Sequence, residues 1–250
     1  MLVNCAVYEN GRKLSDITRA EIHGHIGQPG RFVWVALKDA TPEELEEMRV
    51  QFELHPLAVE DALHGHQRPK VEEYGDCLFV VMRTVDMKGG ELHEGEINVF
   101  VGSDYVLSSR KDVEQGFASV RARAEREPHL LKEGPGYVLY ALMDAVVDRY
   151  FPVIDALEEE LDDIEARIFQ GQPARGNVEA LYELKRRLVV LRHAAAPLHE
   201  ATGKLYGGRV PAVTSGTQEY FRDIYDHLFR INQSIDSLRD MLPTEISVNL

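Results

Sequence analysis

The sequence predicts an α+β protein in which an α/β domain with a mixed or antiparallel sheet precedes long, coiled-coil-like helices. Two observations support this prediction. Up to about residue 110, short strand-like runs alternate with amphipathic segments, whereas after Gly136 apolar residues recur with a period of 3.5. We expect an α/β domain over residues 1–134, a long antiparallel helix pair over 135–207 and a further long helix over 215–250.

Four strands are expected in the first half of the chain. They are rich in β-branched and aromatic residues and comprise 32–37 (FVWVAL), 77–85 (CLFVVMRTV), 96–101 (EINVFV) and 105–109 (YVLSS). The segments Lys88-Gly89-Gly90 and Gly102-Ser103-Asp104 separate the last three strands. Because glycine accepts the positive φ that tight hairpins need, both segments predict hairpin turns.

Two short helices are expected between the strands. The first begins in TPEELEEMRVQFEL with Thr41 as N-cap followed by proline, and acidic residues come next, where they suit the helix dipole. The second, residues 56–64, also starts with proline. Helical spacing puts Glu60 and His64 on one face at i,i+4 and turns Asp61 away from them by about 100°.

Three successive segments carry an apolar seam with alternating steps of four and three residues. The seam residues are Met143, Val147, Tyr150, Ile154, Leu157, Leu161, Ile164 and Ile168, then Leu181, Leu184, Leu188, Leu191, Ala195 and Leu198, and then Phe221, Ile224, Leu228, Ile231, Ile235, Leu238 and Leu242. A period of 3.5 indicates coiled-coil-like packing. The first two helices are expected to form an antiparallel hairpin around Pro173, since their connection is short. The third can pack on that hairpin or on other copies of the chain, and periodicity leaves both arrangements open.

The charge balance excludes some partners. The chain holds 42 acidic and 28 basic residues and carries a net charge of −14. A field of this sign repels nucleic-acid phosphates and attracts cations. We therefore expect no binding of nucleic acid.

Compartment signals indicate a reducing, aqueous environment. Cys5 and Cys77 are the only cysteines and lie far apart, which argues against a thiolate metal site and a disulfide-stapled fold. The N-terminal residues lack the regions of a signal peptide, and the longest apolar runs, such as CLFVVM, are too short to cross a bilayer. We expect this part of the protein to be soluble and cytoplasmic.

Carboxylates recur at helical spacing on the long helices. Asp144 and Asp148 are separated by four residues, as are Asp223 and His227. Mg²⁺ takes oxygen ligands, retains several waters and is satisfied by one or two carboxylates. No single helix offers more, so a complete site is expected to need two elements or two subunits. A solvated helix face remains the alternative for each pair and for the acidic run 155–165.

Signatures of common enzymes are missing from the sequence. It contains no H-E-x-x-H, G-x-S-x-G, P-loop or G-x-G-x-x-G motif, so we expect no catalytic activity. The histidines suit Zn²⁺, Co²⁺ or Ni²⁺ if the fold gathers His23, His25, His55, His64 and His66. A metal-dependent hydrolase using the last three is therefore an alternative, and it requires His64, His66 and a carboxylate to meet in one pocket.

Four ordered motifs resemble the CorA family of magnesium and cobalt transporters. The first, HPLAVEDALHGHQRPKVEEYGDCLFVV, is similar to the signature of the family's cytoplasmic domain. The other three, YALMDAVVDRYFPVIDALEEELDDIE, LKRRLVVLRHAAAPLHE and YFRDIYDHLFRINQSIDSLRDML, resemble its successive long helices in the same order. The resemblance covers nearly the whole chain.

The resemblance implies a homopentameric channel with a funnel-shaped cytoplasmic part, made of an α/β/α domain, a pair of long acidic helices and a stalk helix. The family continues from the stalk into two transmembrane helices that carry a Gly-Met-Asn motif. We therefore expect this sequence to be the cytoplasmic portion of a longer inner-membrane protein, attached to the membrane only through those C-terminal helices. Pro243 falls within the expected stalk, and because proline kinks a helix, an interruption is expected there.

The resemblance also implies which residues bind regulatory ions. Asp61 and Asp223 correspond to a pair that faces across the subunit boundary, and Glu60 and Asp144 correspond to a second, adjacent site. His227 lies one helical turn from Asp223. Mg²⁺ bound between subunits is expected to hold the pore shut, and Mg²⁺ is also the expected cargo, with Co²⁺ or Ni²⁺ as further permeants.

Three alternatives stay open at this point. A zinc transporter of the same superfamily shares the architecture, and the pore segment that would discriminate it lies outside this sequence. The second is the hydrolase described above. The third is a coiled-coil scaffold without metal function.

Overall fold

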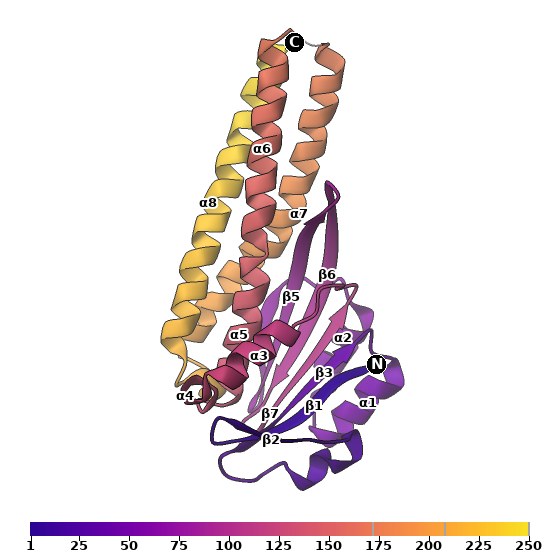
Figure 1. Cartoon of the computed structure of the whole chain (residues 1–250), viewed down its shortest axis with the longest axis vertical. Coiled ribbons are helices and arrows are strands. Elements are labelled where there is room, and N and C mark those ends of the chain that lie inside the picture. Colours follow the sequence, from indigo (N-terminus) through magenta and orange to yellow (C-terminus); the bar gives the residue numbers. More distant parts are fainter. Residues whose placement is uncertain (172, 208, 250) are drawn as a thin grey trace.

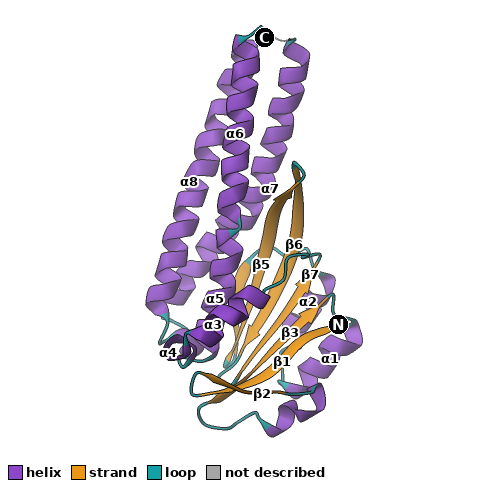
Figure 2. Ribbon diagram, viewed as in Figure 1, coloured by secondary structure: helices purple, strands orange, loops and turns teal. Residues whose placement is uncertain are grey.

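A mixed sheet forms the middle layer of the N-terminal half in the computed structural model, which describes residues 1–171, 173–207 and 209–249 (Figures 1 and 2). The strands are β1 (Leu2–Glu9), β2 (Arg12–Asp16), β3 (Arg31–Lys38), β4 (Lys70–Tyr74), β5 (Cys77–Lys88), β6 (Glu91–Val101) and β7 (Tyr105–Lys111), in the order β2-β1-β3-β7-β6-β5-β4. β3 and β7 are parallel and all other neighbours are antiparallel. The predicted mixed sheet is therefore confirmed.

The helices follow the strands in two groups. Their bounds are η1 (Arg19–Gly24), α1 (Pro42–Gln51), α2 (Pro56–His64), α3 (Ala118–Arg126), α4 (Pro128–Leu131), α5 (Pro135–Asp148), α6 (Tyr150–Phe169), α7 (Ala174–Tyr206), η2 (Ala212–Thr214) and α8 (Gln218–Asn249). Both short helices expected between the strands are present as α1 and α2. Thr41 caps α1 as predicted, because its side chain accepts a hydrogen bond from the backbone N–H of Glu44.

Strand alternation gives the sheet two apolar faces. Val33 and Val35 of β3 face α1 and α2, whereas Trp34 between them faces the core shared with α3 to α8. The α/β/α layering implied by the resemblance follows from this alternation. The division of the chain into three domains stays a prediction, because one continuous apolar core joins the second face of the sheet to the long helices.

Four strands were predicted, and three more are present. β2 is exposed along its whole length, and β4 (KVEEY) is an edge strand with one fully buried residue, so neither shows the apolar alternation on which strand prediction depends. Both predicted hairpin turns occur. Gly89 and Gly90 have positive φ, as expected, but Gly102 does not, and a Cβ at Gly102 would instead lie 2.3 Å from the Tyr105 ring.

The seam between Met143 and Ile168 does not run along one helix as predicted. The helix ends at Asp148, and α6 begins at Tyr150 after Arg149, whose N–H bonds to the carbonyl three residues back. Pro152 explains the break, because it has no N–H to donate to the Asp148 carbonyl and its ring would clash with that group.

Three long helices, α6, α7 and α8, extend side by side from the sheet (Figure 1). α6 and α7 form the predicted hairpin, and Arg187 of α7 reaches Glu160 of α6 at 2.7 Å. The seam of α8 packs within the chain, mainly on α7, and none of its seven seam residues is more than 3% exposed. The seam itself therefore gives no argument for self-association.

Two further expectations concern α8 and the membrane. The interruption expected at Pro243 is wrong, since α8 continues through this residue to Asn249. In the part of the chain that the structure describes, no helix combines the length and apolar character needed to span a bilayer.

Leu228→Ala tests the α7–α8 seam. Leu228 is fully buried, so the substitution leaves a cavity and should lower the free energy of unfolding by about 2–5 kcal/mol. Val189 of α7 is 40% exposed, and Val189→Ala should change the free energy of unfolding by less than about 0.5 kcal/mol. Urea denaturation of both variants measures the difference, and equal effects would contradict the buried seam.

His199 of α7 makes this packing sensitive to acid. Its ring centroid lies 4.0 Å from that of Tyr225 on α8, and its Nε2 is buried without a hydrogen-bond partner. Burial lowers the pKa of His199, and the nearby Asp226 only partly offsets this effect. The unfolded chain therefore binds a proton on this residue more readily than the folded chain does.

Stability should consequently fall as the pH drops below about 6.5, the ordinary histidine value, toward the lower folded-state pKa. His199→Gln should make that fall shallower, which thermal melting across this pH range measures. His193→Gln alters an exposed position on the same helix and should leave the profile unchanged. Identical profiles for wild type and His199→Gln would refute the expectation.

Candidate metal centre

α2 carries the first two predicted ligands. His55 caps this helix by accepting a hydrogen bond from the Leu57 N–H, and the helix ends at Gly65, which has a φ of +67°. Asp61 pairs with Lys70 at 2.7 Å, and the same ammonium lies 2.8 Å from Glu72. Burial opposes the charge of Lys70, but its hydrogen bonds to the two carboxylates outweigh this effect and raise its pKa.

Glu60 faces solvent next to Asp61 on α2. The Nδ1 atom of His64 lies 2.9 Å from the Glu60 carbonyl, so this i,i+4 contact involves the backbone and leaves the carboxylate free. Among the residues that the structure describes, neither Glu60 nor Asp61 joins a group of three metal-ligating side chains. Within one chain, α2 therefore offers isolated carboxylates.

The loop after α2 is fixed to the sheet by polar contacts, several of them partly buried. Arg83 of β5 donates hydrogen bonds to the carbonyls of His66 and Gln67. Glu96 of β6 is 6% exposed, and its carboxylate accepts from the Gln67 N–H and from the Asn98 amide, both at 2.9 Å. These contacts hold the chain that leads from α2 to β4.

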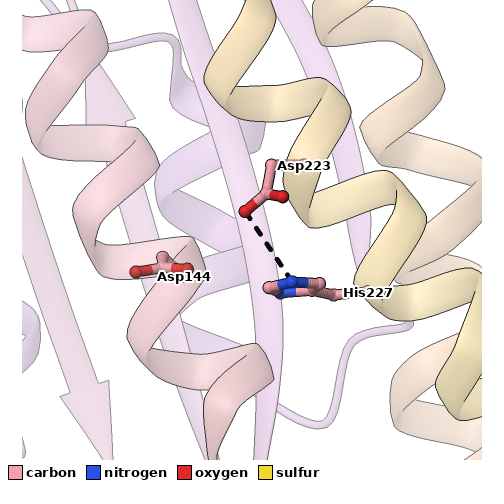
Figure 3. Close-up of side chains that lie close together, drawn as sticks. All are labelled: Asp144, Asp223 and His227. Atoms are coloured by element: carbon pink, nitrogen blue, oxygen red, sulfur yellow. Dashed lines mark ion pairs between the residues drawn. The ribbon is translucent and has the colours of Figure 1, made fainter.

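Asp144, Asp223 and His227 form a cluster between α5 and α8 (Figure 3). One ligand atom of each residue lies within 4.8 Å of the corresponding atoms of the other two. Asp144 projects from α5 and is 7% exposed, whereas the side chain of Asp223 on α8 is 59% exposed. The cluster thus extends from the protein interior to its surface.

Two charged neighbours complete the electrostatics of the cluster. Arg123 of α3 pairs with Asp144, with Nη2 2.9 Å from Oδ2. Asp148 lies one turn after Asp144, and its pKa is raised, first by desolvation and then by the charge of Asp144. Burial and the charge of Asp144 also raise the pKa of Tyr140 to about 12. The region around Asp144 is therefore locally negative and only partly neutralised.

The donor set fits a divalent cation. His227 Nε2 lies 3.8 Å from Asp223 Oδ2, and its Nδ1 is buried without a hydrogen-bond partner. Two carboxylates suit Mg²⁺, which keeps several waters, while an imidazole suits Co²⁺, Ni²⁺ or Zn²⁺. Asp144, Asp223 and His227 would hold the ion, and the ring of Phe151, 5.8 Å from that of His227, packs against the imidazole.

The structure brings three of the predicted ligands, Asp144, Asp223 and His227, together in one chain. The resemblance assigned Asp144 and Asp223 to two adjacent sites between subunits, and that pairing across subunits stays a prediction. Asp148 was noted for its spacing but was not included among the ligands. Arg123 was missed, and no sequence signal identifies it because α3 and α5 meet only in the folded chain.

Among the described residues, the cavity beside His66 does not bring His64 and His66 together, as the alternative hydrolase requires. A cavity of about 130 Å³ is lined by His66 together with Glu94, Glu96 and Asp112, but not by His64. His55 instead stacks on Tyr74, with 4.4 Å between ring centroids. The condition set for this alternative is therefore not met.

Comparison of the sequence with known proteins identifies a family. Residues 29–244 match the family described as "CorA-like Mg2+ transporter protein". The cobalt/magnesium transport protein CorA of Thermotoga maritima is 34% identical over 202 residues, which are 80% of this chain and 57% of that protein. The putative metal ion transporter YfjQ of Bacillus subtilis is 31% identical over 211 residues, 83% of this chain and 64% of that protein. The chain thus spans less than two thirds of these relatives.

Solved structures show the same fold at low sequence identity. The full-length CmaX protein superposes with a TM-score of 0.81 at 19% identity, covering 99% of this chain and 76% of that one. The soluble domain of CorA from Methanocaldococcus jannaschii gives 0.75 at 17%, covering 100% and 98%. The ZntB cytoplasmic domain from Vibrio parahaemolyticus gives 0.73 at 13%, covering 99% and 97%. The α+β fold is therefore shared with these proteins.

Glu96→Ala tests how the loop after α2 is held. The substitution leaves the Gln67 N–H and the Asn98 amide without their acceptor and should lower the free energy of unfolding by about 1–3 kcal/mol. Glu94 on the same strand is more exposed and pairs with Arg83 at 3.3 Å, so Glu94→Ala should cost less than about 1 kcal/mol. Urea denaturation measures both values, and a larger loss for Glu94→Ala would contradict this account.

Proposed function

This chain belongs to the CorA-like Mg2+ transporter family, and we propose that it forms the cytoplasmic, ion-sensing domain of a divalent-cation channel. The observation that carries the proposal is the Asp144–Asp223–His227 cluster, which links α5, packed on the sheet, to the long helix α8. An ion held there would tie α8 to the sheet domain. The protein would then sense the ion through a change in how tightly α8 is held to the sheet domain.

Electrostatics gives such an ion its effect. Two carboxylate oxygens within 4.8 Å of each other repel by at least roughly 0.9 kcal/mol at an effective dielectric near 80, and by at least roughly 3.5 kcal/mol near 20. A bound divalent cation supplies positive charge that converts this repulsion into attraction. Because the ion favours the arrangement that binds it, the cytosolic concentration of the ion sets the population of that arrangement.

The assembled protein is the second part of the proposal. Asp61 of one subunit faces Asp223 of the next, Glu60 adjoins Asp144 in the same way, and ions between subunits stabilise the closed pore. Both Asp223 and Glu60 present exposed carboxylates, as such contacts need. The subunits form a homopentameric funnel at the inner membrane, with residues 1–134 as the α/β domain, 135–207 as the helix pair and 215–250 as the stalk.

Mg²⁺ is the proposed regulatory ion and cargo, and Co²⁺ or Ni²⁺ are further permeants. The names of relatives as cobalt/magnesium transport proteins support this choice. A zinc transporter of the same superfamily is the second candidate, because the imidazole of His227 is a ligand that Zn²⁺ accepts readily. The domain itself has no catalytic role in this proposal.

Mg²⁺ titration tests the cluster directly. At an ion concentration ten times the Kd, binding should add about 1.4 kcal/mol to the stability of the wild-type chain, which thermal melting detects. Asp144→Asn and Asp223→Asn should each abolish this gain, because each removes one of the two carboxylates. Repeating the titration with Co²⁺ and Zn²⁺ ranks the affinities of the cluster for the three ions.

Asp240→Asn is the matched control for this titration. It removes one negative charge from an exposed position on α8, where Asp240 forms an ion pair only with Arg239 in the described part of the chain. The ion-dependent gain should survive this substitution. A gain that disappears equally in Asp240→Asn, or that persists in Asp144→Asn and Asp223→Asn, would reject the cluster as the sensing site.

A further inference from the structure

Arg123 pairs with one carboxylate oxygen of Asp144, which is one of the proposed metal ligands. Its guanidinium Nη2 lies 2.9 Å from Asp144 Oδ2, at hydrogen-bond distance. The Asp144 side chain is only 10% exposed, whereas that of Arg123 is 39% exposed. The carboxylate is therefore fixed in the interior, and the cation that neutralises it approaches from a more open side.

We propose that Arg123 is a built-in competitor of the divalent cation for Asp144. This inference rests on the proposed function of the Asp144–Asp223–His227 cluster. An ion that binds Asp144 must either share the carboxylate with the guanidinium, at the cost of repulsion between two cations, or displace it. In both cases Arg123 raises the ion concentration at which the cluster is half-saturated.

The chemistry of arginine makes this competition permanent. A lysine or histidine can lose its proton when a second cation approaches, but the guanidinium remains charged at every physiological pH. Arg123 therefore gives a fixed positive charge beside Asp144. The half-saturating concentration is set by this charge together with the two carboxylates.

The surroundings of Arg123 give it a place to move. A groove of about 1060 Å³ lies beside α3 and the α5–α6 junction, and both Arg123 and Asp148 line it. Asp148 has no ion pair among those found in the described chain, and it lies one helical turn from Asp144. When an ion takes Asp144, the guanidinium can turn into this groove and keep a carboxylate nearby. Displacement therefore does not require burying an unpaired charge.

The contact of Arg123 with Asp144 also links two helices. In the structure it joins α3 to α5, so its release would loosen α3 at the moment when the ion joins α5 to α8. Ion binding thus exchanges one helix-to-helix link for another. Removing the arginine should strengthen ion binding, whereas removing an ordinary structural contact should not.

Arg123→Gln tests the proposal by Mg²⁺ titration of the 250-residue chain, with calorimetry and thermal melting as readouts. Eliminating the positive charge that pairs with Asp144 should lower the half-saturating Mg²⁺ concentration by roughly tenfold or more, because Arg123 and a divalent ion repel each other even at the dielectric of water. Arg123→Lys keeps the charge and should remain closer to wild type. Arg121→Gln is the matched control, because Arg121 lies on the same helix but pairs with Glu125 and Asp16.

Each pattern of results decides a different point. A half-saturating concentration in Arg123→Gln that is unchanged or higher overturns the competitor role, while Asp144-dependent binding in wild type would leave the proposed function intact. Absence of saturable Mg²⁺ binding in both wild type and Arg123→Gln overturns both proposals. In the double variant Arg123→Gln, Asp144→Asn, the gain in Mg²⁺ affinity expected for Arg123→Gln alone should be absent.

A second measurement covers the case in which Arg123→Gln does not fold. In the wild-type chain, the NMR signal of the Arg123 side-chain Nε–H should shift as Mg²⁺ is added, with the same midpoint as the thermal stabilisation. The Arg121 signal should not move with that midpoint. An Arg123 signal that stays fixed through saturation overturns the proposal.

Discussion

The ion pairing of the buried Asp144 side chain constrains the helices that surround it. α5 lies between the sheet and α8, and eleven of its residues are buried, among which Asp144 alone is charged. An isolated buried charge costs several kcal/mol, so Asp144 requires partners. Arg123 from α3 and the His227–Asp223 pair from α8 approach it from different helices. Arg123 compensates the charge of Asp144, whereas Asp223 adds a second negative charge, so α3, α5 and α8 meet at a point that is only partly neutralised.

Local sequence patterns predicted the elements better than the way they meet. Alternation along β3 and the 3.5-residue seam of α8 depend only on neighbouring residues, and both appear in the structure as expected. The break at Arg149 was readable from Pro152 but was obscured by a seam that continues across it. Whether α8 packs within the chain or between copies was undecidable, because both arrangements bury the same residues.

For the candidate site, too, the sequence predicted the residues but not how they meet. Asp144, Asp223 and His227 were all identified from motifs, but their meeting in one chain depends on α5 and α8 lying side by side. The cations beside the predicted ligands were not foreseen: Lys70 at Asp61 and Arg123 at Asp144. The net charge of −14 therefore says little about the field at either carboxylate, because close neighbours outweigh distant charges in water with salt.

The position of Asp223 near one end of α8 has a mechanical consequence. From Asp223 to Asn249 the helix continues for 26 residues, which at about 1.5 Å per residue is roughly 39 Å. A tilt of about 5° at the cluster would carry the far end through roughly 3.4 Å, by the geometry of a rod of that length. A small rotation of α8 near the Asp144–Asp223–His227 cluster would therefore be amplified at the far end of the helix, which is directed away from the sheet (Figure 1).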